Sequence, residues 1–300
     1  MTRVDYSPQL AAAESAARMA GAYLRSRFEE AEKQVDAVFA HDVKLRLDRE
    51  TQELIACELK KSFPGYSFLG EEGALASPDS HAEWVVDPLD GTVNYFYGIP
   101  LFCVSIALRV DGKPVLGCVY DPMRDECFCA LAGGVPVCNG RPIRVSSREK
   151  MADAVVFIGH GTHDGSGAEG MRRFAHLSPQ VRKIRILGTA ALTLCYIAAG
   201  RFDAYVENRI HLWDMAAARV ILEAAGGVLE FSPTDEKGLT GSVLAWNGKI
   251  PLRQALECPP APPAPIPTMP ASPLVSSSAP DSSAFPSPST SSPAFPSPSC

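Results

Sequence analysis

A change of composition near residue 259 limits how much of this 300-residue chain can form a folded core. Residues 259–300 hold 14 Pro and 12 Ser in 42 positions, and Asp281 is their only charged residue. The hexapeptide AFPSPS occurs there twice, at 284–289 and 294–299. Such a segment buries too little apolar surface to offset the entropy lost on ordering. We therefore predict a disordered Pro/Ser-rich tail over 259–300. This tail is either a ligand for proline-recognising domains or a segment without a function.

Charge and hydropathy exclude several classes of protein. Lys and Arg total 28 against 34 Asp and Glu, a net charge of −6, which disfavours binding to nucleic acid through phosphate contacts. No apolar run reaches the roughly 18 residues of a membrane span, and the first residues lack the pattern of a secretory signal. The nine cysteines are scattered and imply no disulfide framework. We expect a cytoplasmic protein without a membrane or nucleic-acid partner.

Two of the cysteines, Cys127 and Cys129, are separated by one residue within a predicted strand. Side chains alternate along a strand, so both thiols lie on one face. The spacing is shorter than that of the usual two-residue zinc knuckle, so the sequence alone predicts no metal site there.

Hydrophobic spacing and turn residues predict strands and helices mixed throughout residues 1–258. Ser7 and Pro8 are expected to begin the first helix, which should run to about Glu32. A second helix is expected from Asp48 to about 63. Further helices are predicted at 169–176, 189–199, 213–225 and 251–257. Strands are predicted at 67–69, 83–86, 102–110, 115–120, 127–131, 143–145, 154–158, 183–187, 203–206, 228–231 and 243–245.

Residues 84–94, WVVDPLDGTVN, end a predicted strand with two carboxylates on a tight turn. Asp87 and Asp90 are three residues apart, so they can share one hard cation or bridge two. The backbone amides after Gly91 would point at an anion. An acidic cap on a structural turn explains the same residues, and this segment alone leaves both interpretations open.

Two further acids lie at the ends of predicted elements. Glu71 follows the short strand at 67–69, and Asp214 lies at the start of the helix predicted at 213–225. An Asp at that position is either a helix N-cap, worth about 1 kcal/mol, or a metal ligand.

Five segments together resemble the signatures of the inositol monophosphatase family. They are 68–72 (FLGEE), 84–94, 187–191 (LGTAA), 203–207 (DAYVE) and 213–227 (WDMAAARVILEAAGG), in the order and spacing of that family. The resemblance covers about Leu10 to Glu257. It implies a layered α/β/α/β/α sandwich of the sugar-phosphatase kind. An N-terminal half, 1–146, would carry most metal ligands, and a C-terminal half, 147–258, would complete the active site.

The resemblance also implies a Mg²⁺-dependent phosphomonoesterase. Glu71, Asp87 and the carbonyl of Leu89 would hold a first ion, and Asp87, Asp90 and Asp214 a second. Oxygen ligands of this kind suit Mg²⁺. Four carboxylates close together would repel one another, and divalent ions would relieve that repulsion.

Hydrolysis would then proceed by two-metal, in-line attack of water on phosphorus. Thr92 and Asp48 would orient the water, Glu71 would belong to the same catalytic set, and the amides of Gly91 and Thr92 would hold the phosphate. Asp48 is also interpretable as a helix N-cap. The family's Thr before this Asp and a Lys earlier in the chain are missing, which leaves the water-orienting network and any third metal open. The substrate walls would be Gly188, Thr189, Ala190, Glu207 and Asp214.

The expected substrate is inositol 1-phosphate or a similar small polyol phosphate. GTVN at 91–94 resembles the inositol branch, and Glu207 stands where the family contacts an inositol hydroxyl. Fructose 1,6-bisphosphate or another small phosphate ester is the enzymatic alternative. A catalytically silent scaffold acting through the tail is the alternative of a different class, although such a relative has no reason to keep all four acids. The resemblance further implies a homodimer and inhibition by Li⁺.

Overall fold

The computed structural model describes residues 4–30, 33, 35–38, 43–75, 77, 80–159 and 166–257. The tail predicted over 259–300 lies outside these residues, so its disorder stays a prediction. The helices of the described part are α1 (Ser7–Ser26), α2 (Arg46–Ser62), α3 (Thr92–Phe96), α4 (Ser166–Leu177), α5 (Ala190–Ala198), α6 (Leu212–Ala224) and α7 (Leu252–Glu257). None of them is long and apolar enough to cross a membrane.

The first sheet has eight strands in the order β10-β9-β8-β7-β6-β5-β3-β4. All neighbours are antiparallel except β3 and β5, which run parallel. The strands are β3 (Ser67–Gly70), β4 (Gly73–Leu75), β5 (Ala82–Asp90), β6 (Cys103–Val110), β7 (Lys113–Asp121), β8 (Glu126–Leu131), β9 (Val137–Cys138) and β10 (Arg141–Pro142).

The second sheet has five strands in the order β12-β11-β13-β15-β14, with β11 parallel to both of its neighbours. They are β11 (Val155–Ile158), β12 (Lys183–Arg185), β13 (Ala204–His211), β14 (Val228–Pro233) and β15 (Thr240–Trp246). A separate antiparallel ribbon joins β1 (Val35–Val38) to β2 (Val43–Leu45).

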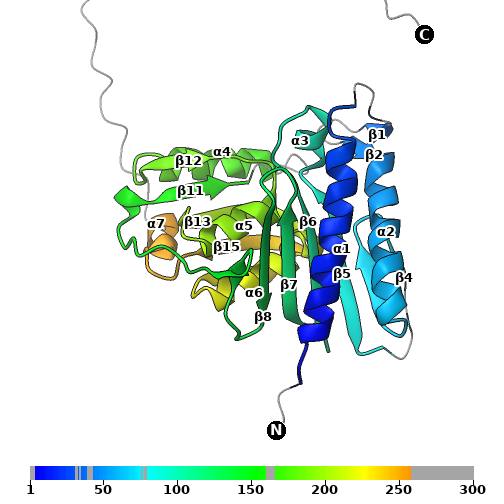
Figure 1. Ribbon diagram of the computed structural model, residues 1–300. Helices are drawn as coiled ribbons and strands as arrows, with labels where there is room; N and C mark the ends of the chain where they lie inside the picture. The colour runs from blue at the N-terminus through cyan, green and yellow to red at the C-terminus, as the bar shows by residue number, and fades with distance from the viewer. Residues whose placement is uncertain are drawn as a thin grey trace, which may run out of the picture. The chain divides into compact units, whose positions relative to one another are not determined.

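Helices and sheets alternate in five layers (Figure 1). The α1 and α2 helices cover one face of the first sheet, α5 and α6 lie between the two sheets, and α4 and α7 cover the outer face of the second. The sequence accounts for the middle layer, because α5 is apolar around nearly its whole circumference and such a helix must be buried on all sides. This arrangement confirms the predicted α/β/α/β/α class.

Several element boundaries differ from the sequence prediction. The first helix ends at Ser26 rather than near Glu32, and its N-cap is Tyr6, because the Asp5 carboxylate accepts the Ser7 backbone N–H at 2.9 Å and places Ser7 inside the helix. Residues 143–145 form no strand. The ribbon of β1 and β2 and the short α3 were missed, since each is too short to show a periodic pattern.

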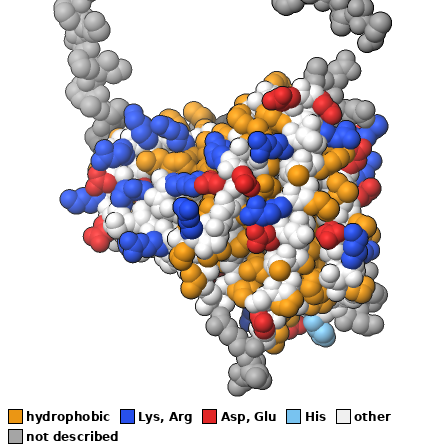
Figure 2. Space-filling model, viewed as in Figure 1, with side chains coloured by type: hydrophobic (Ala, Val, Ile, Leu, Met, Phe, Trp, Pro, Cys, Tyr) orange, Lys and Arg blue, Asp and Glu red, His pale blue; other side chains and the backbone are white. Residues whose placement is uncertain are grey.

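Basic side chains are unevenly spread over the surface. On the face seen in Figure 2, Lys and Arg gather over the side formed by α4, β11 and β12. Exposed basic residues of these elements and their connection are Arg172, Arg182, Lys183 and Arg185. The negative net charge is therefore an average, and the absence of a nucleic-acid partner stays a prediction.

Candidate active site

The parallel strands β3 and β5 bring the first carboxylates together. Glu71 follows the last residue of β3, and its backbone N–H donates to the Val86 carbonyl at 3.2 Å. Asp87 and Asp90 lie at the end of β5. Carboxyl ends of parallel strands meet at one edge of a sheet, so these acids share that edge.

A β-bulge places Asp87 and Asp90 on the same face of the sheet. Asp87 pairs with Ser105 and Asp90 with Cys103, so three residue steps on β5 match two steps on β6. Regular alternation would send residues three apart to opposite faces, and the extra residue restores a common face. Pro88 and Leu89 form this bulge, which spacing along the sequence alone did not reveal.

The two central helices begin beside these acids. Asp214 is the third residue of α6, and its Oδ2 accepts the His211 backbone N–H at 2.8 Å. Asp90 accepts hydrogen bonds from the start of α5, at 2.5 Å from the Thr189 hydroxyl and 2.7 Å from the Ala191 N–H. Asp214 is therefore not the N-cap considered from the sequence, and Asp90 has a structural role toward α5.

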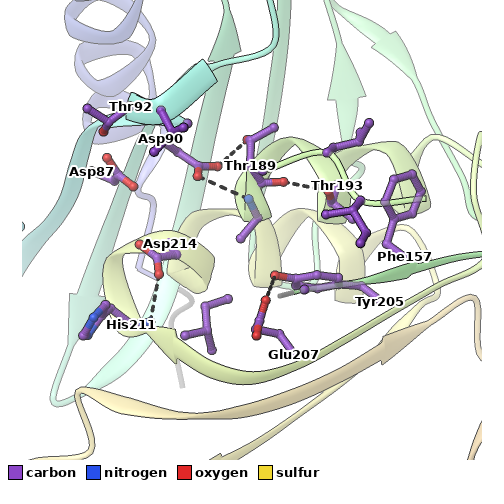
Figure 3. A pocket seen from close by; sticks show the side chains of 18 of the residues that line it. Asp87, Asp90, Thr92, Phe157, Thr189, Thr193, Tyr205, Glu207, His211 and Asp214 are labelled. Carbon is purple, nitrogen blue, oxygen red and sulfur yellow. Dashed lines mark hydrogen bonds between the residues drawn. The ribbon is translucent and has the colours of Figure 1, made fainter. Parts of the chain in front are cut away.

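One cavity of about 360 Å³ collects nearly all of the predicted site residues. In Figure 3, Asp87 and Asp90 face Asp214 across it, with Thr92 and Thr189 beside them. Predicted residues on its wall are Glu71, Asp87, Leu89, Asp90, Gly91, Thr92, Gly188, Thr189, Ala190, Glu207 and Asp214.

Gly91 holds the turn between β5 and α3. Its φ is 100°, and a Cβ there would lie 2.9 Å from the Leu101 carbonyl oxygen. Only glycine fits such a position without strain. The next residue along, Thr92, donates its hydroxyl to the Leu89 carbonyl at 3.0 Å, and Asn94 ties this turn to the segment before α5 by donating to the Leu187 carbonyl at 2.7 Å.

Asp48 does not line the cavity. It is buried as the third residue of α2, where its Oδ2 accepts the Leu45 N–H at 2.9 Å, so it is not the N-cap. Its Oδ1 is buried without a hydrogen-bond partner among the described residues. Burial, together with the negative charge of Glu71, raises the pKa of Asp48 to about 8.

The wall opposite the first sheet comes from β13. Glu207 is only 8% exposed, and the Tyr205 hydroxyl donates to its Oε2 at 3.4 Å. A second bulge lies between Glu207 and Ile210, where three residue steps match two on β15. Arg209, in this bulge, also lines the cavity. Arg209 is exposed to solvent as well as lining the cavity, whereas Glu207 is buried.

The aromatic pair before α6 also lies at the site. His211 and Trp213 both line the cavity, with their rings stacked at 4.8 Å between centroids and 11° between planes. Since ring contacts between residues two apart depend on the turn into the helix, the sequence did not indicate the stacking.

The sequence model of the inositol monophosphatase family matches residues 5–257 of this chain. This chain belongs to the inositol monophosphatase family. The family is one of phosphatases, so the predicted phosphoric monoester hydrolase is confirmed at that level. Dependence on Mg²⁺ is general in the family.

The relatives of this chain are named either as inositol monophosphatases or as Nus factor SuhB. The inositol-1-monophosphatase of Mesorhizobium japonicum is 40% identical over 240 residues, 78% of this chain and 90% of its own. The Nus factor SuhB of Xylella fastidiosa is 41% identical over 199 residues, 66% of this chain and 70% of its own. The second name is a further reason why the absence of a nucleic-acid partner stays a prediction.

Solved structures show the same fold. The extragenic suppressor protein suhB of Bartonella henselae superposes with a TM-score of 0.75 at 36% identity, covering 84% of this chain and 97% of its own. The inositol monophosphatase of Anabaena gives 0.73 at 32% identity, with 86% and 98% covered. The homodimer and the cytoplasmic location stay predictions.

The electrostatics of the site suit a hard cation. Burial raises the pKa of Asp87 well above its ordinary value, and neighbouring carboxylates raise it further. Burial also raises the pKa of Asp214, followed by the charges of Glu71 and Asp90. Carboxylates that oppose one another's ionisation, with a backbone carbonyl beside them, are the oxygen set that Mg²⁺ prefers. The donor chemistry therefore fits the family's metal.

The carboxylates of the cavity are spaced more widely than three ligands of one ion. Within the described residues, no three of these carboxylates have oxygens all within 4.8 Å of one another. Ligands on one octahedral Mg²⁺ lie at most about 4.2 Å apart, from bonds of roughly 2.1 Å. The Asp90 carboxylate is turned toward α5, where it accepts from Thr189 and Ala191.

Proposed function

We propose that this protein hydrolyses small polyol phosphates, with inositol 1-phosphate the first candidate. One observation carries the proposal: three carboxylates at the edge of the first sheet and one from α6 line a single cavity, whose opposite wall presents a buried carboxylate, Glu207. A carboxylate can accept several hydrogen bonds from sugar hydroxyls. One end of the cavity therefore suits a phosphate with cations, and the other suits a polyol.

In this proposal Mg²⁺ is held by the carboxylates of Glu71, Asp87, Asp90 and Asp214 and by the Leu89 carbonyl. When bound, the ions would lower the pKa of water and neutralise charge on the phosphate and the leaving oxygen. Residues 1–146 supply four of these five ligands and residues 147–258 supply Asp214. The division into two halves stays a proposal.

The remaining polar groups position water and phosphate. The Thr92 hydroxyl donates a hydrogen bond to the Leu89 carbonyl, so its oxygen lone pairs can accept a hydrogen bond from water. The family resemblance gives Asp48 a share in orienting this water, and its Oδ1 has no hydrogen-bond partner among the described residues, but the residue itself does not line the cavity. The amides of Gly91 and Thr92 would hold the phosphate.

A phosphate-release panel tests the proposal. Purified full-length protein is assayed with Mg²⁺ on inositol 1-phosphate, fructose 1,6-bisphosphate, glycerol phosphates and sugar phosphates. We expect turnover of inositol 1-phosphate that disappears with EDTA and is inhibited by Li⁺. Turnover of another ester with none on inositol phosphates would refute the substrate, and no turnover of any ester would favour the silent scaffold.

Arg209 favours fructose 1,6-bisphosphate as the second candidate, because this cation lines the cavity and a second phosphate would meet it there. Arg209→Gln should raise KM for the bisphosphate about tenfold or more and leave KM for inositol 1-phosphate within about twofold. Arg185→Gln, a change in an exposed residue outside the cavity, is the matched control. Equal effects on both substrates would remove this candidate.

A further inference from the structure

Three buried thiols lie together on the first sheet, away from the carboxylates. Cys118 on β7 pairs across the strands with Cys129 on β8, and Cys127 lies two residues before Cys129 on the same face. The three Sγ–Sγ distances are 3.6, 3.6 and 3.7 Å. No side chain of the three is more than 4% exposed, and none is in a disulfide.

This thiol cluster, defined by Cys118, Cys127 and Cys129, lies on the opposite face of the sheet from the catalytic cavity. It packs in the core beneath α1, with Ala13 and Ala17. The cavity lies on the other face, where Cys103 is 3.6 Å from Asp90. The proposed phosphatase chemistry uses none of the three thiols.

The spacing of the sulfurs matches one coordination geometry. A tetrahedral Zn²⁺ with bonds of roughly 2.3 Å to sulfur sets its sulfur ligands about 3.8 Å apart. A planar three-sulfur centre with the same bonds needs about 4.0 Å. The observed Sγ–Sγ distances, 3.6–3.7 Å, are close to the distance that a tetrahedral zinc site requires, so the strands need not move to bind the ion. Within the described residues it is also the one set of three potential metal ligands all within 4.8 Å of one another.

Charged residues of α1 lie beside the cluster. The Arg18 guanidinium is 5.2 Å from the centre of the Tyr120 ring and donates to Asp125 at 3.2 Å, at the end of the β7–β8 hairpin. Asn139 accepts the Cys127 backbone N–H at 2.9 Å and fixes that strand end. Glu14, paired with Arg18 at 3.0 Å, is on the same helix. A cation beside sulfur ligands favours their thiolate form.

We propose that Cys118, Cys127 and Cys129 form a binding site for a thiophilic divalent ion of the Zn²⁺ class. Binding converts three thiols to thiolates, forms three metal–sulfur bonds and releases up to three protons to solvent, with no change of oxidation state. The resulting centre carries one negative charge, which Arg18 offsets. Water completes the fourth position and leaves this charge unchanged. The ion would tie β7 to β8 and stabilise the sheet on which α1 packs.

Cadmium titration of the reduced full-length protein tests this site, in excess Mg²⁺ so that the carboxylates are occupied. We expect one equivalent of Cd²⁺ to bind with an ultraviolet thiolate-to-metal absorption and with two to three protons released. Cys118→Ala and Cys127→Ser should lose this step. The matched controls Cys57→Ser, at an exposed cysteine, and Cys195→Ala, at a buried cysteine outside the cluster, should keep it.

X-ray absorption on the zinc-loaded wild-type protein makes the test independent of whether the variants fold. Three sulfur neighbours at about 2.3 Å are expected. Equal Cd²⁺ binding by wild type and Cys118→Ala, or a zinc shell of oxygen and nitrogen only, would overturn the proposal. Inositol phosphate turnover should persist in Cys127→Ser, so failure of this site and failure of the proposed function are distinguishable.

Discussion

Asp48 combines a structural hydrogen bond with a poised charge. One of its oxygens accepts the Leu45 N–H at the start of α2, and the other is buried and unpaired among the described residues. Burial of an unpaired acceptor is costly, and a raised pKa is the usual consequence. A carboxylate placed this way reduces the stability of the fold, and groups with such raised pKa values are common at functional sites.

The pKa of Asp48 predicts how stability depends on pH. Its folded pKa of about 8 lies above the ordinary value of 3.8, so the folded state keeps a proton that the unfolded chain releases. The free energy of unfolding should therefore fall as pH rises from about 4 to about 8, by up to about 1.4 kcal/mol per pH unit for this group. The buried acids Asp87 and Asp214 act with the same sign.

Urea unfolding in EDTA between pH 5 and pH 8 measures this effect in wild type and in Asp48→Asn. The variant should lose less stability across that range, because one of the titrating groups is gone. Parallel pH profiles for the two proteins would show that Asp48 titrates normally.

At the scale of elements, the position of α6 on the first sheet depends on one glycine. Gly117 of β7 lies directly under this helix, and a Cβ there would be 2.0 Å from the Ala217 carbonyl oxygen. Because α6 begins with the segment that carries Asp214, the same contact sets how near this acid comes to Asp87 and Asp90.

Gly117→Ala should therefore affect stability and activity together. The added methyl must push α6 off the sheet, which we expect to cost about 1–3 kcal/mol in the free energy of unfolding. Turnover should fall more than tenfold as Asp214 moves away from the other acids. Gly65→Ala is the control, because nothing lies within 4 Å of that position. Normal turnover by a destabilised Gly117→Ala would dissociate the helix position from the site.

The sequence predicted the long helices and strands and the identity of the acidic residues. It did not predict the side-chain directions that depend on irregular backbone. The strands β6 and β7 were both predicted, and Asp111 and Gly112 between them adopt positive φ, 49° and 76°, as a tight hairpin turn requires. The bulge between Asp87 and Asp90 could not be predicted, because pairing with β6 creates it. The same is true of Arg209, whose place in the cavity depends on the bulge in β13.

At the scale of the whole molecule, an ion pair between buried Asp203 and the partly exposed Arg148 fixes the segment that joins the two sheets. Asp203, before β13, is fully buried, and its carboxylate accepts the Arg148 guanidinium at 2.7 Å and the Ser146 hydroxyl at 2.6 Å. Arg148 also donates to the Gly200 carbonyl at 3.0 Å. The boundary expected near residue 146 from the family resemblance is thus a clamped connection, although the division into halves itself stays a prediction.

Removing the cation of this clamp should destabilise the whole fold. Arg148→Ala leaves the buried Asp203 charge with fewer partners, at an expected cost of about 3 kcal/mol in the free energy of unfolding. Arg148→Lys keeps the charge but not the forked geometry and should cost less. Denaturant titration of both variants measures the difference. Equal stability of Arg148→Ala and wild type would show that Ser146 and the backbone N–H of Val155 suffice.

The central claim is that the carboxylates around the cavity serve Mg²⁺-dependent hydrolysis and do not only cap helices. Asp90 tests it most directly, because its carboxylate accepts hydrogen bonds at the start of α5 and is also a proposed Mg²⁺ ligand. Asn in its place can still accept from Thr189 and Ala191 while avoiding the cost of a buried charge. We therefore measure kcat of Asp90→Asn on inositol 1-phosphate at saturating Mg²⁺, beside its free energy of unfolding in EDTA. The account predicts unfolding free energy within about 1 kcal/mol of wild type and kcat lower by about 10² to 10³. Near-normal kcat in a protein that unfolds more easily would contradict it, because Asp90 would then be only a cap for α5.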